Sequence, residues 1–434
     1  MSAYHKQGQQ SNENRDQELG SKQRVELDLQ EAVKQRFNSF CMSVGIQTLM
    51  SMMEQDVEAA AGQKGKHNPD RTAYRHGKQK TTIPAGSQRL EIERPRIRSL
   101  ETDRELPIPS YDAFANDEEL LEAALNRMLH GMSSRDYRHG IEPYDDRMTS
   151  SGTSKSSVSE RFVKASSKKV KDVLNRRFDD ETIPVVLIDG IQLGDYTAVV
   201  AMGITAEGKK VIMGVRIGST ENAEVCQDLL TDLIDRGLRF HRGLLAVIDG
   251  AKALRKALKT VFGHNVLIQR CQVHKLRNVL DYLPKHRWEW VKRKMRKAYA
   301  CDDYADAVRQ LRSLATSLAQ DHPDASASLR EGLEETVTVL HMTIPGLLQR
   351  SLRSTNAIES GFSMVAKNIR NVKNWKNGSM VKRWVCSALL DAESRTHRIA
   401  GYRSLHLLIT ELQRLTVTEE TQEVDGIETQ SNTA

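Results

Sequence analysis

Two aspartates follow short apolar runs that end in the same phrase. The run VVLIDG ends at Asp189 and Gly190, and the run LLAVIDG ends at Asp249 and Gly250. Runs of this length and apolar content predict buried β-strands. A single aspartate after a strand is usually an ordinary turn or capping residue. Two matched aspartates at the ends of neighbouring parallel strands, however, would meet at the edge where α/β proteins bind their ligands.

Two ionised carboxylates at close range repel each other, so one pKa must rise unless a cation lies between them. A divalent metal ion is the natural remedy, and carboxylate oxygens favour Mg²⁺ over metals that prefer thiolates. Sites with two such ions activate a nucleophile and stabilise a leaving oxygen in phosphoryl transfer. This chemistry predicts a third carboxylate from another element.

The segment RSTNAIESGFSMVAKNIR supplies that carboxylate. Glu359 falls in the first turn of a predicted helix that Thr355 or Asn356 caps. The ordinary alternative is a capping-box glutamate that bonds back to the cap residue. The composition favours a functional role, because no acid lies between Glu359 and Asp391. Lysine, arginine and tryptophan accumulate in the same stretch. A lone acid at the head of a basic, aromatic stretch is typical of a metal ligand beside a polyanion.

A second basic segment, residues 270–297, begins with RCQVHKLRN, in which Cys271 and His274 lie three residues apart. This spacing could suggest zinc, but no second pair has ligand spacing, so a four-ligand structural zinc site is not expected. The preferred interpretation is a strand-to-helix junction near the active site. There His274, Arg277 and Asn278 would contact DNA or orient a carboxylate.

The elements that must position these residues follow from the pattern around them. From Ile183 the runs IPVVLIDG, TAVVAMGI and KKVIMGVRIG predict three strands that pair as an antiparallel meander. A helix with Thr220 as its cap follows, then the strand ending at Asp249, a helix from Ala251 to Thr260 and the strand NVLIQRC. The order βββαβαβ predicts an α/β core with a mixed five-stranded sheet. The helical pattern of residues 284–345 predicts an all-α insertion into this core.

Upstream of the core, the chain predicts a mainly helical DNA-binding region. Residues 1–22 are polar and predict a disordered tail. Residues 23–115 combine amphipathic helices with a hairpin around the turn PAGSQ. The hairpin is rich in bases, which would either line a phosphate backbone or form a solvated face: Arg71, Arg75, Lys78, Lys80, Arg94, Arg96 and Arg98.

Residues 116–180 predict a region like a helix-turn-helix. A helix from Asp117 to Leu129 precedes one that Thr153 or Ser154 caps, whose outer face is basic. The last helix of such a motif enters the major groove, although a simple connecting helix explains the pattern equally well. The candidate DNA contacts are Lys155, Arg161, Lys164 and Lys168 here, and Arg270, Arg277, Asn278, Lys367, Arg370, Lys373 and Trp375 further along.

The remaining boundaries follow from the same patterns. Residues 181–283 form the first part of the core, residues 346–402 its C-terminal helices, and residues 403–434 a C-terminal helix with an acidic tail. The +7 formal charge of the 434 residues is too small to identify a partner. Five widely separated cysteines argue against a disulfide framework, and no apolar run reaches the roughly 20 residues that span a bilayer. We therefore expect a soluble cytoplasmic protein, associated with the nucleoid if it is bacterial.

The strand order, the three acids and the helical insertion together resemble the RNase H-like DDE transposases. The phrases VIDGAKALRKAL, FGHNVLIQRCQVHKLRNV and RSTNAIES are similar to those of the bacterial Mutator-type (IS256-like) insertion-sequence transposases, over about residues 25–400. The acids are 60 (249 − 189) and 110 (359 − 249) residues apart, and the long second gap leaves room for an insertion. The chain departs from the family pattern at the turn GIQLGDY after Asp189, where Asp195 is a second acid close to Asp189 in sequence.

The resemblance implies that Asp189, Asp249 and Glu359 bind two Mg²⁺ ions, for which Mn²⁺ often substitutes. It implies that a metal-activated water cuts double-stranded DNA at the ends of the element, and that the freed 3′-OH attacks a target phosphodiester. Cys271 and His274 match the C(2)H signature of the family. The upstream region would read terminal inverted repeats, and joining two ends implies a homodimer or a larger assembly, with no membrane partner.

Two other functions remain open. The first is a domesticated DNA-binding regulator without catalysis, which would have no need to retain three acids. The second is another RNase H-like nuclease, such as a junction resolvase or an integrase. That class explains neither the QRCxxHxxRN phrase nor the helical insertion.

Overall fold

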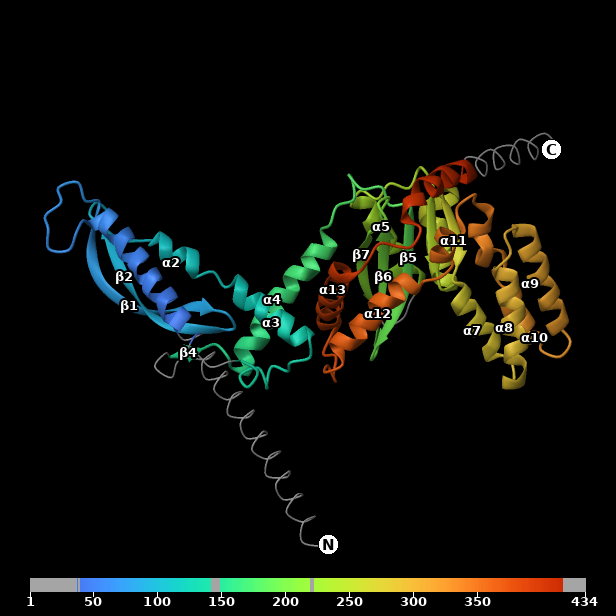
Figure 1. The fold of residues 1–434 in the computed structure, drawn as a ribbon, viewed down its shortest axis with the longest axis horizontal. Coiled ribbons are helices and arrows are strands. Elements are labelled where there is room, and N and C mark those ends of the chain that lie inside the picture. Colours follow the sequence, from blue (N-terminus) through green and yellow to red (C-terminus); the bar gives the residue numbers. More distant parts are fainter. Residues whose placement is uncertain (1–36, 38–39, 142–148, 219–221, 417–434) are drawn as a thin grey trace, which may run out of the picture. The chain divides into compact units, whose positions relative to one another are not determined.

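The computed structural model describes residues 37, 40–141, 149–218 and 222–416. The chain divides into two compact units, the first with residues up to 128 and 132–162, the second with residues 129–131 and those from 163 onward. Each unit combines helices with one β-sheet (Figure 1). The tails predicted at 1–22 and from Thr418 lie outside the described residues.

The first unit is built around the predicted hairpin. Strands β1 (Ala73–Ala85) and β2 (Gln88–Ser99) pair antiparallel, which confirms the two-residue period read from the sequence. Two-residue strands β3 (Glu105–Leu106) and β4 (Ser150–Ser151) extend the hairpin to a four-stranded sheet; they are too short to leave a periodic signal. A helix over residues 40–61 buries Leu49, Met53 and Val57 against this sheet.

Helices α2 (Pro109–Phe114), α3 (Glu118–Leu129) and α4 (Lys155–Leu174) follow the hairpin. The Ser154 hydroxyl accepts a hydrogen bond from the Ser157 backbone N–H at 3.3 Å, so Ser154 is the cap of α4. The connection from α3 to α4 runs over residues 130–154 and contains β4, whereas the helices of a helix-turn-helix are joined by about 3–4 residues. The DNA-binding role of this region stays a prediction.

The second unit contains the five-stranded mixed sheet. Its strands lie in the order β7-β6-β5-β8-β9: β5 (Val185–Leu193), β6 (Tyr196–Ile204), β7 (Lys210–Gly218), β8 (Leu244–Ile248) and β9 (Val266–Arg270). Strands β5, β6 and β7 pair antiparallel, whereas β5 with β8 and β8 with β9 are parallel. The predicted meander is therefore confirmed, and the two strands that lead to the aspartates are parallel neighbours.

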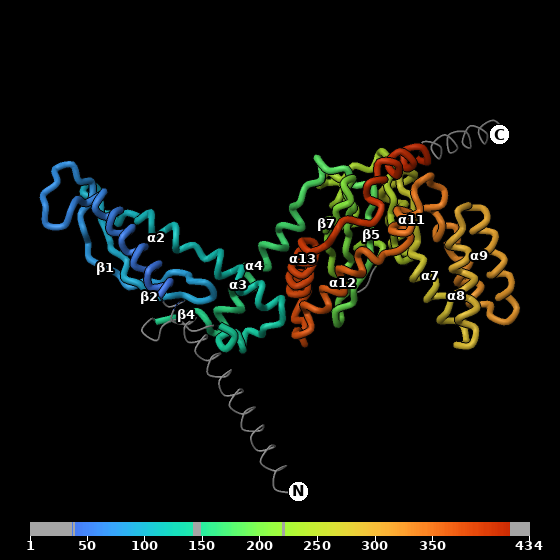
Figure 2. The backbone as a smooth tube through the Cα atoms, in the orientation of Figure 1, coloured from blue at the N-terminus to red at the C-terminus, as the bar shows by residue number. Residues whose placement is uncertain are grey.

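Helices cover both faces of this sheet, which explains why its central strands are almost continuously apolar. Helices α5 (Ala223–Asp235) and α6 (Lys252–Phe262) pack on one face. Helices α12 (Asn356–Ile369) and α13 (Gly378–Arg395) pack on the other, beside β5 and β7 in Figure 2. The cap of α5 is Asn222, whose side chain accepts from the Val225 N–H at 2.9 Å. The sequence suggested Thr220 as the cap, a residue outside the described part of the chain.

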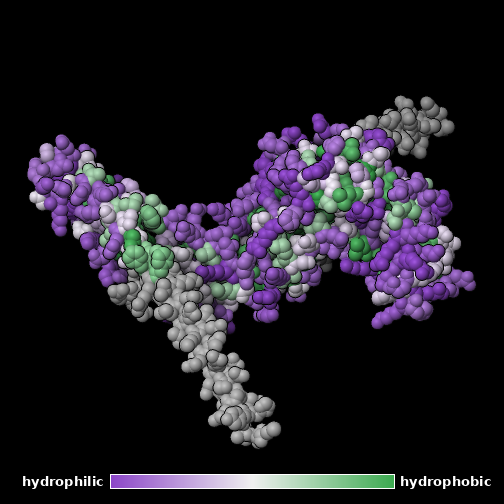
Figure 3. Space-filling view, viewed as in Figure 1, coloured by the Kyte–Doolittle hydropathy of each residue, from purple (hydrophilic) through white to green (hydrophobic). Residues whose placement is uncertain are grey.

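Beyond β9 the chain is helical. The elements are α7 (Gln272–Asp281), α8 (Lys285–Tyr299), α9 (Tyr304–Leu318), α10 (Pro323–Arg330), the 3₁₀ segment η2 (Glu334–His341) and α11 (Gly346–Leu352). The elements from α7 to η2 share a hydrophobic core of their own under a largely hydrophilic surface (Figure 3). η2 packs along β9, where the Thr338 hydroxyl donates to the Ile268 carbonyl at 2.6 Å. No helix in the described ranges is long and apolar enough to cross a membrane.

Candidate active site

Asp189 and Asp249 lie side by side on the sheet because their strands are in register. Ile188 of β5 pairs with Ile248 of β8, so each aspartate directly follows a paired residue. Val186 and Ile188 belong to the core beneath α5 and α6. Side chains alternate along a strand, so Asp189 points to the opposite face, which α12 contacts.

Asp189 is nearly buried, with 7% of its surface exposed. Its Oδ1 accepts a hydrogen bond from the Gly190 N–H at 2.9 Å, and Oδ1 of Asp249 accepts from the Ala251 N–H at 2.8 Å. Burial, followed by the negative charge of Asp249, raises the pKa of Asp189 to about 6, and Glu359 adds to the increase. The charges of Asp249 and Glu359 therefore act on a nearly buried carboxylate, and like charges repel. We call these three residues the acidic cluster.

Glu359 reaches this cluster from α12. Thr355 occupies the N-cap position, but its side chain makes no capping bond to the helix backbone. Its hydroxyl donates to Oε1 of Glu359 at 2.8 Å instead. Glu359 is the fourth residue of the helix, one position beyond the glutamate of a capping box, and it bonds back to the cap residue through that residue's hydroxyl and not through its backbone N–H.

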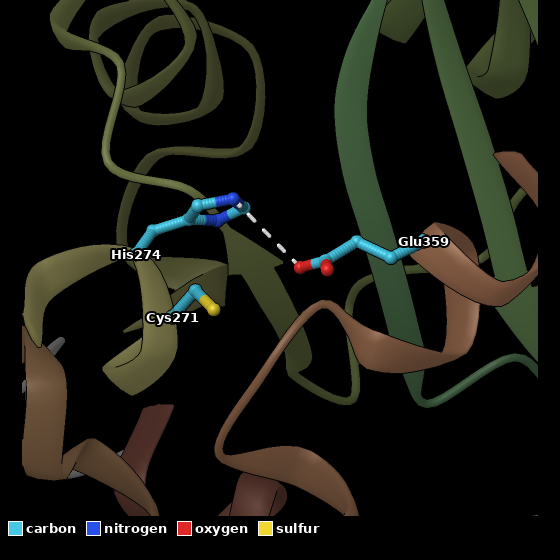
Figure 4. A group of neighbouring side chains, drawn as sticks. All are labelled: Cys271, His274 and Glu359. Atoms are coloured by element: carbon cyan, nitrogen blue, oxygen red, sulfur yellow. Dashed lines mark ion pairs between the residues drawn. The ribbon is translucent and has the colours of Figure 1, made fainter. Parts of the chain in front are cut away.

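Cys271 and His274 stand on the other side of Glu359, where β9 passes into α7. His274 Nε2 lies 3.8 Å from Glu359 Oε1, and Figure 4 shows the two side chains pointing toward each other, with Cys271 beside them. The hydrogen bond with Cys271 and the charges of Cys271, Asp189 and Glu359 raise the pKa of His274 to about 9, although burial opposes the increase. Burial alone would raise the pKa of the Cys271 thiol, but hydrogen bonds from His274 and Thr355 outweigh it and lower that pKa.

Glu359 belongs both to the acidic cluster and to a compact group of possible metal ligands. The ligand atoms of Cys271, His274 and Glu359 all lie within 4.8 Å of one another. A thiolate with an imidazole suits zinc-like metals, whereas three carboxylates suit Mg²⁺. The Cys271 sulfur already accepts a hydrogen bond from the backbone N–H of Thr355 at 3.5 Å, so it has a partner within the protein without a metal ion. The carboxylate set has the unbalanced buried charge that a hard divalent cation would neutralise.

The turn after Asp249 depends on Gly250. Its φ is 108°, and a Cβ at this position would collide with Nε of Arg270. Arg270 is 6% exposed and donates to the carbonyls of Gly250 and Glu331, the latter at 2.7 Å. The sequence suggested Arg270 as a DNA contact, but in this structure its guanidinium joins the Asp249 turn to the helical segment.

Lys275 is a buried cation that the sequence analysis did not single out. It is 2% exposed, and its ammonium donates to the carbonyls of Ser328 and Glu331. Burial and the neighbouring Arg270 lower its pKa to about 8. Lys275 stands in a run of basic residues, and nothing in the sequence distinguishes it from those that face solvent.

The other candidate DNA contacts are mostly at the surface. Exposed residues are Lys155, Lys164, Lys168, Arg277, Asn278, Lys367, Arg370 and Lys373, while Arg161 and Trp375 are partly buried. Trp375 lies against the β5–β6 turn, where a Cβ on Gly194 would be 3.1 Å from its ring. The hairpin bases differ, because carboxylates pair with most of them: Arg75 with Glu54, Lys78 with Glu93, Lys80 with Glu91, Arg94 and Arg96 with Glu105, and Arg98 with Asp103.

A cavity of about 520 Å³ lies apart from the three acids. It is lined by Lys252, Asn278, Asp281, Tyr282, Asp324, Ala327, Ser328 and Glu331. Three of these side chains are acidic and one is basic, which disfavours a phosphate ligand. The sheet is the better candidate for a functional site, because Asp189 is nearly buried and its pKa is raised by burial and by Asp249.

Comparison with known proteins gives the family of the chain. The profile described as "Transposase, Mutator family" matches residues 18–397. The transposase for insertion sequence element ISRM5 from Rhizobium meliloti (strain 1021) is 26% identical over 329 residues, 72% of this chain and 78% of that protein. The transposase for insertion sequence element IS256 in transposon Tn4001 from Staphylococcus aureus is 24% identical over 359 residues, 78% of this chain and 86% of that protein. The chain belongs to the Mutator family of transposases.

Proposed function

We propose that this protein cleaves the ends of an insertion sequence and transfers them to target DNA, using Asp189, Asp249 and Glu359 to hold two Mg²⁺ ions. The observation that carries the proposal is the acidic cluster itself. A nearly buried aspartate, whose pKa is raised to about 6, shares its site with two further carboxylates. Apolar packing does not need such a cluster, and a perturbed pKa of this kind favours a functional site.

The residues present fit the metal. Three carboxylates offer the hard oxygen ligands that Mg²⁺ prefers, and their mutual repulsion falls when a cation binds. When bound, two such ions supply an activated nucleophile and stabilise the leaving oxygen of a phosphodiester. The protein's part is to fix the ligands: the Gly190 N–H holds Asp189, the Ala251 N–H holds Asp249, and Thr355 holds Glu359.

The topology supports an RNase H-like core. The strand order β7-β6-β5-β8-β9, with an acid on β5 and another after β8, places both carboxylates at the centre of the sheet. The helical segment between β9 and α12 accounts for the long sequence gap before Glu359. We extend this proposal to the DDE mechanism and to Mn²⁺ as a substitute ion.

Exposed bases would bind the DNA. Lys367, Arg370 and Lys373 follow Glu359 along α12 and the loop after it, and all three are exposed. Phosphate contacts of this kind position a duplex without reading its sequence. Reading of terminal inverted repeats is assigned to residues 116–180, and joining two ends requires at least a homodimer.

Incubation of the protein with labelled DNA carrying the ends of the element tests the function. With Mg²⁺ we expect cleavage at the ends and joined products, and EDTA should abolish both while binding to the ends persists. Binding without cleavage in Mg²⁺ would indicate a DNA-binding regulator instead. Cleavage that follows DNA structure, such as a four-way junction, and ignores the ends would indicate a resolvase-like nuclease.

A further inference from the structure

Thr355 lies completely buried at the head of α12, between Cys271 and Glu359. We propose that Thr355 is a positioning residue that holds the Glu359 carboxylate in the orientation needed to bind metal, with Cys271 and His274 as its supports. The inference rests on the proposed function, because it assigns a partner to one of the proposed metal ligands.

The hydrogen bonds around Thr355 converge on one hydroxyl. Its Oγ1 lies 2.8 Å from Glu359 Oε1, 3.4 Å from Cys271 Sγ and 3.5 Å from His274 Nδ1. A hydroxyl has a single proton, and the carboxylate is both the nearest and the strongest of these acceptors. The proton therefore goes to Glu359, which leaves the lone pairs of Oγ1 for an N–H at Nδ1 of His274, while Cys271 Sγ accepts from the Thr355 backbone N–H.

The conformation of Thr355 leaves its hydroxyl available for this role. Most N-cap residues are extended and use their side chain to accept an N–H of the first turn. Thr355 has φ −78° and ψ 11°, and its side chain makes no such bond. Its backbone carbonyl accepts from the N–H groups of Ile358 and Glu359 instead, both at 3.0 Å.

The other oxygen of Glu359 remains available. Within the described part of the chain, no protein donor bonds to Oε2. A glutamate carboxylate rotates easily about its last torsion, so an unanchored Glu359 would sample many orientations. With Oε1 fixed by Thr355 and Oε2 left open, the carboxylate is presented to a cation with one oxygen already committed, which is how outer-shell partners orient metal ligands.

Two variants separate the hydroxyl from the shape of the side chain. Thr355→Val keeps the volume and loses the hydroxyl, whereas Thr355→Ser keeps the hydroxyl and loses the methyl group. Thr336→Val is the matched control, because Thr336 is 1% exposed and its hydroxyl donates to the Leu333 carbonyl at 2.6 Å, in a bond that does not involve the acids.

The measurement is the affinity for Mn²⁺ of the full chain bound to DNA with element ends, by electron paramagnetic resonance of the free ion. We expect Thr355→Val to weaken the affinity by about 10- to 100-fold, the usual effect of removing an outer-shell partner. Thr355→Ser and Thr336→Val should bind Mn²⁺ as the native chain does. The concentration of Mg²⁺ that gives half-maximal cleavage should be higher for Thr355→Val than for the native chain.

Native Mn²⁺ affinity in a folded Thr355→Val protein would overturn the proposal, as would a larger loss in Thr355→Ser than in Thr355→Val. If Thr355→Val does not fold, Thr355→Ala and Thr355→Ser form a second pair that differ only in the hydroxyl, and equal affinities would again overturn it. Glu359→Gln distinguishes a failure of the proposed metal site from a failure of the positioning role of Thr355. If Glu359→Gln binds Mn²⁺ normally, the proposed metal site itself fails; if it loses the ion and Thr355→Val does not, only the positioning role fails.

Discussion

At the scale of single residues, the charged form of Asp189 lowers the stability of the folded protein. Asp189 is buried beside two other acids, and each of these features disfavours its charged form. Only the Gly190 N–H and the nearby His274 lower its pKa. Without a metal ion the site therefore reduces the stability of the fold, and a bound cation would recover that loss.

This cost predicts a pH-dependent effect of Asp189→Asn in metal-free protein. The folded-state pKa, about 6, lies above the ordinary 3.8, so the native state keeps its proton longer than the unfolded chain. Stability should therefore fall as pH rises from about 4 to about 6, by on the order of 2–3 kcal/mol, and stay lower above that range. Asp189→Asn removes this fall, so the variant should be more stable than the native chain at pH 7 and similar to it near pH 4.

Denaturant unfolding in EDTA at the two pH values measures the difference. Asp195→Asn is the control, since Asp195 is an exposed acid on the same β5–β6 hairpin. Added Mg²⁺ should reduce the stability difference between Asp189→Asn and the unsubstituted protein at pH 7. The reason is that the ion binds and stabilises only the protein that keeps Asp189. An Asp189→Asn advantage of equal size at both pH values would contradict the account.

Sequence patterns predicted the three acids but not what surrounds them. Asp189 and Asp249 were identifiable because matched phrases end two apolar runs. Thr355 was read as a helix cap and occupies that position, but its hydroxyl donates to Glu359 and lies beside the sulfur of Cys271. Contacts of this kind depend on residues 84 positions apart, which no local pattern records.

At the scale of elements, the turn between β8 and α6 connects the acidic cluster to the helical segment. Gly250 takes a left-handed conformation and its carbonyl accepts from Arg270, which also reaches Glu331 beyond α10. The geometry of Asp249 is therefore fixed by β8 on one side and by Arg270 on the other.

Gly250→Ala tests this connection. The new Cβ would collide with the Arg270 side chain, in addition to the strain of positive φ. Gly263→Ala is the matched control, because Gly263 has φ 57° but no neighbouring atom within 4 Å of a new Cβ. We expect Gly250→Ala to cost about 1–3 kcal/mol more than Gly263→Ala in chemical unfolding, as overpacking of a filled site does. Equal losses would show that Arg270 does not restrict the turn.

Elements were more predictable than their capping and burial. The periods of two and of about 3.6 residues located the hairpin, the meander and the helices after β9, because long regular elements repeat their signal. The cap of α5 was misassigned, since Asn222 and Thr220 are both good capping residues. The burial of Arg270 and Lys275 could not be predicted, because a basic run normally reads as a solvated face.

At the scale of the whole molecule, the distribution of charge matters more than its sum of +7. The hairpin is rich in bases, but carboxylates lie within 3.5 Å of most of them. Helix α4 and the loop after α12 carry exposed lysines. The number of phosphates that lysine and arginine neutralise determines how many counterions DNA releases on binding, and bases already paired with carboxylates are less available for this.

This difference predicts unequal salt dependence for two lysine pairs. Lys155→Gln with Lys164→Gln, on α4, should lower the slope of log affinity against log salt by about 0.9 for each phosphate that a lysine no longer neutralises. Lys78→Gln with Lys80→Gln, in the hairpin, removes the same charge. These lysines are already paired with Glu93 and Glu91, so we expect the slope to change less. Fluorescence anisotropy with element-end DNA at several salt concentrations measures both slopes. A larger change for the hairpin pair would place the DNA on the hairpin.

We propose that Asp189, Asp249 and Glu359 together perform metal-dependent strand cleavage. The most direct measurement compares single-turnover cleavage of element-end DNA in Mg²⁺ by Asp189→Asn, Asp249→Asn, Glu359→Gln and the control Asp195→Asn. We expect each of the first three to lose cleavage while still binding the ends, because each removes a charged ligand, and we expect the control to cleave as the native chain does. Undiminished cleavage by any one of the three would contradict the assignment.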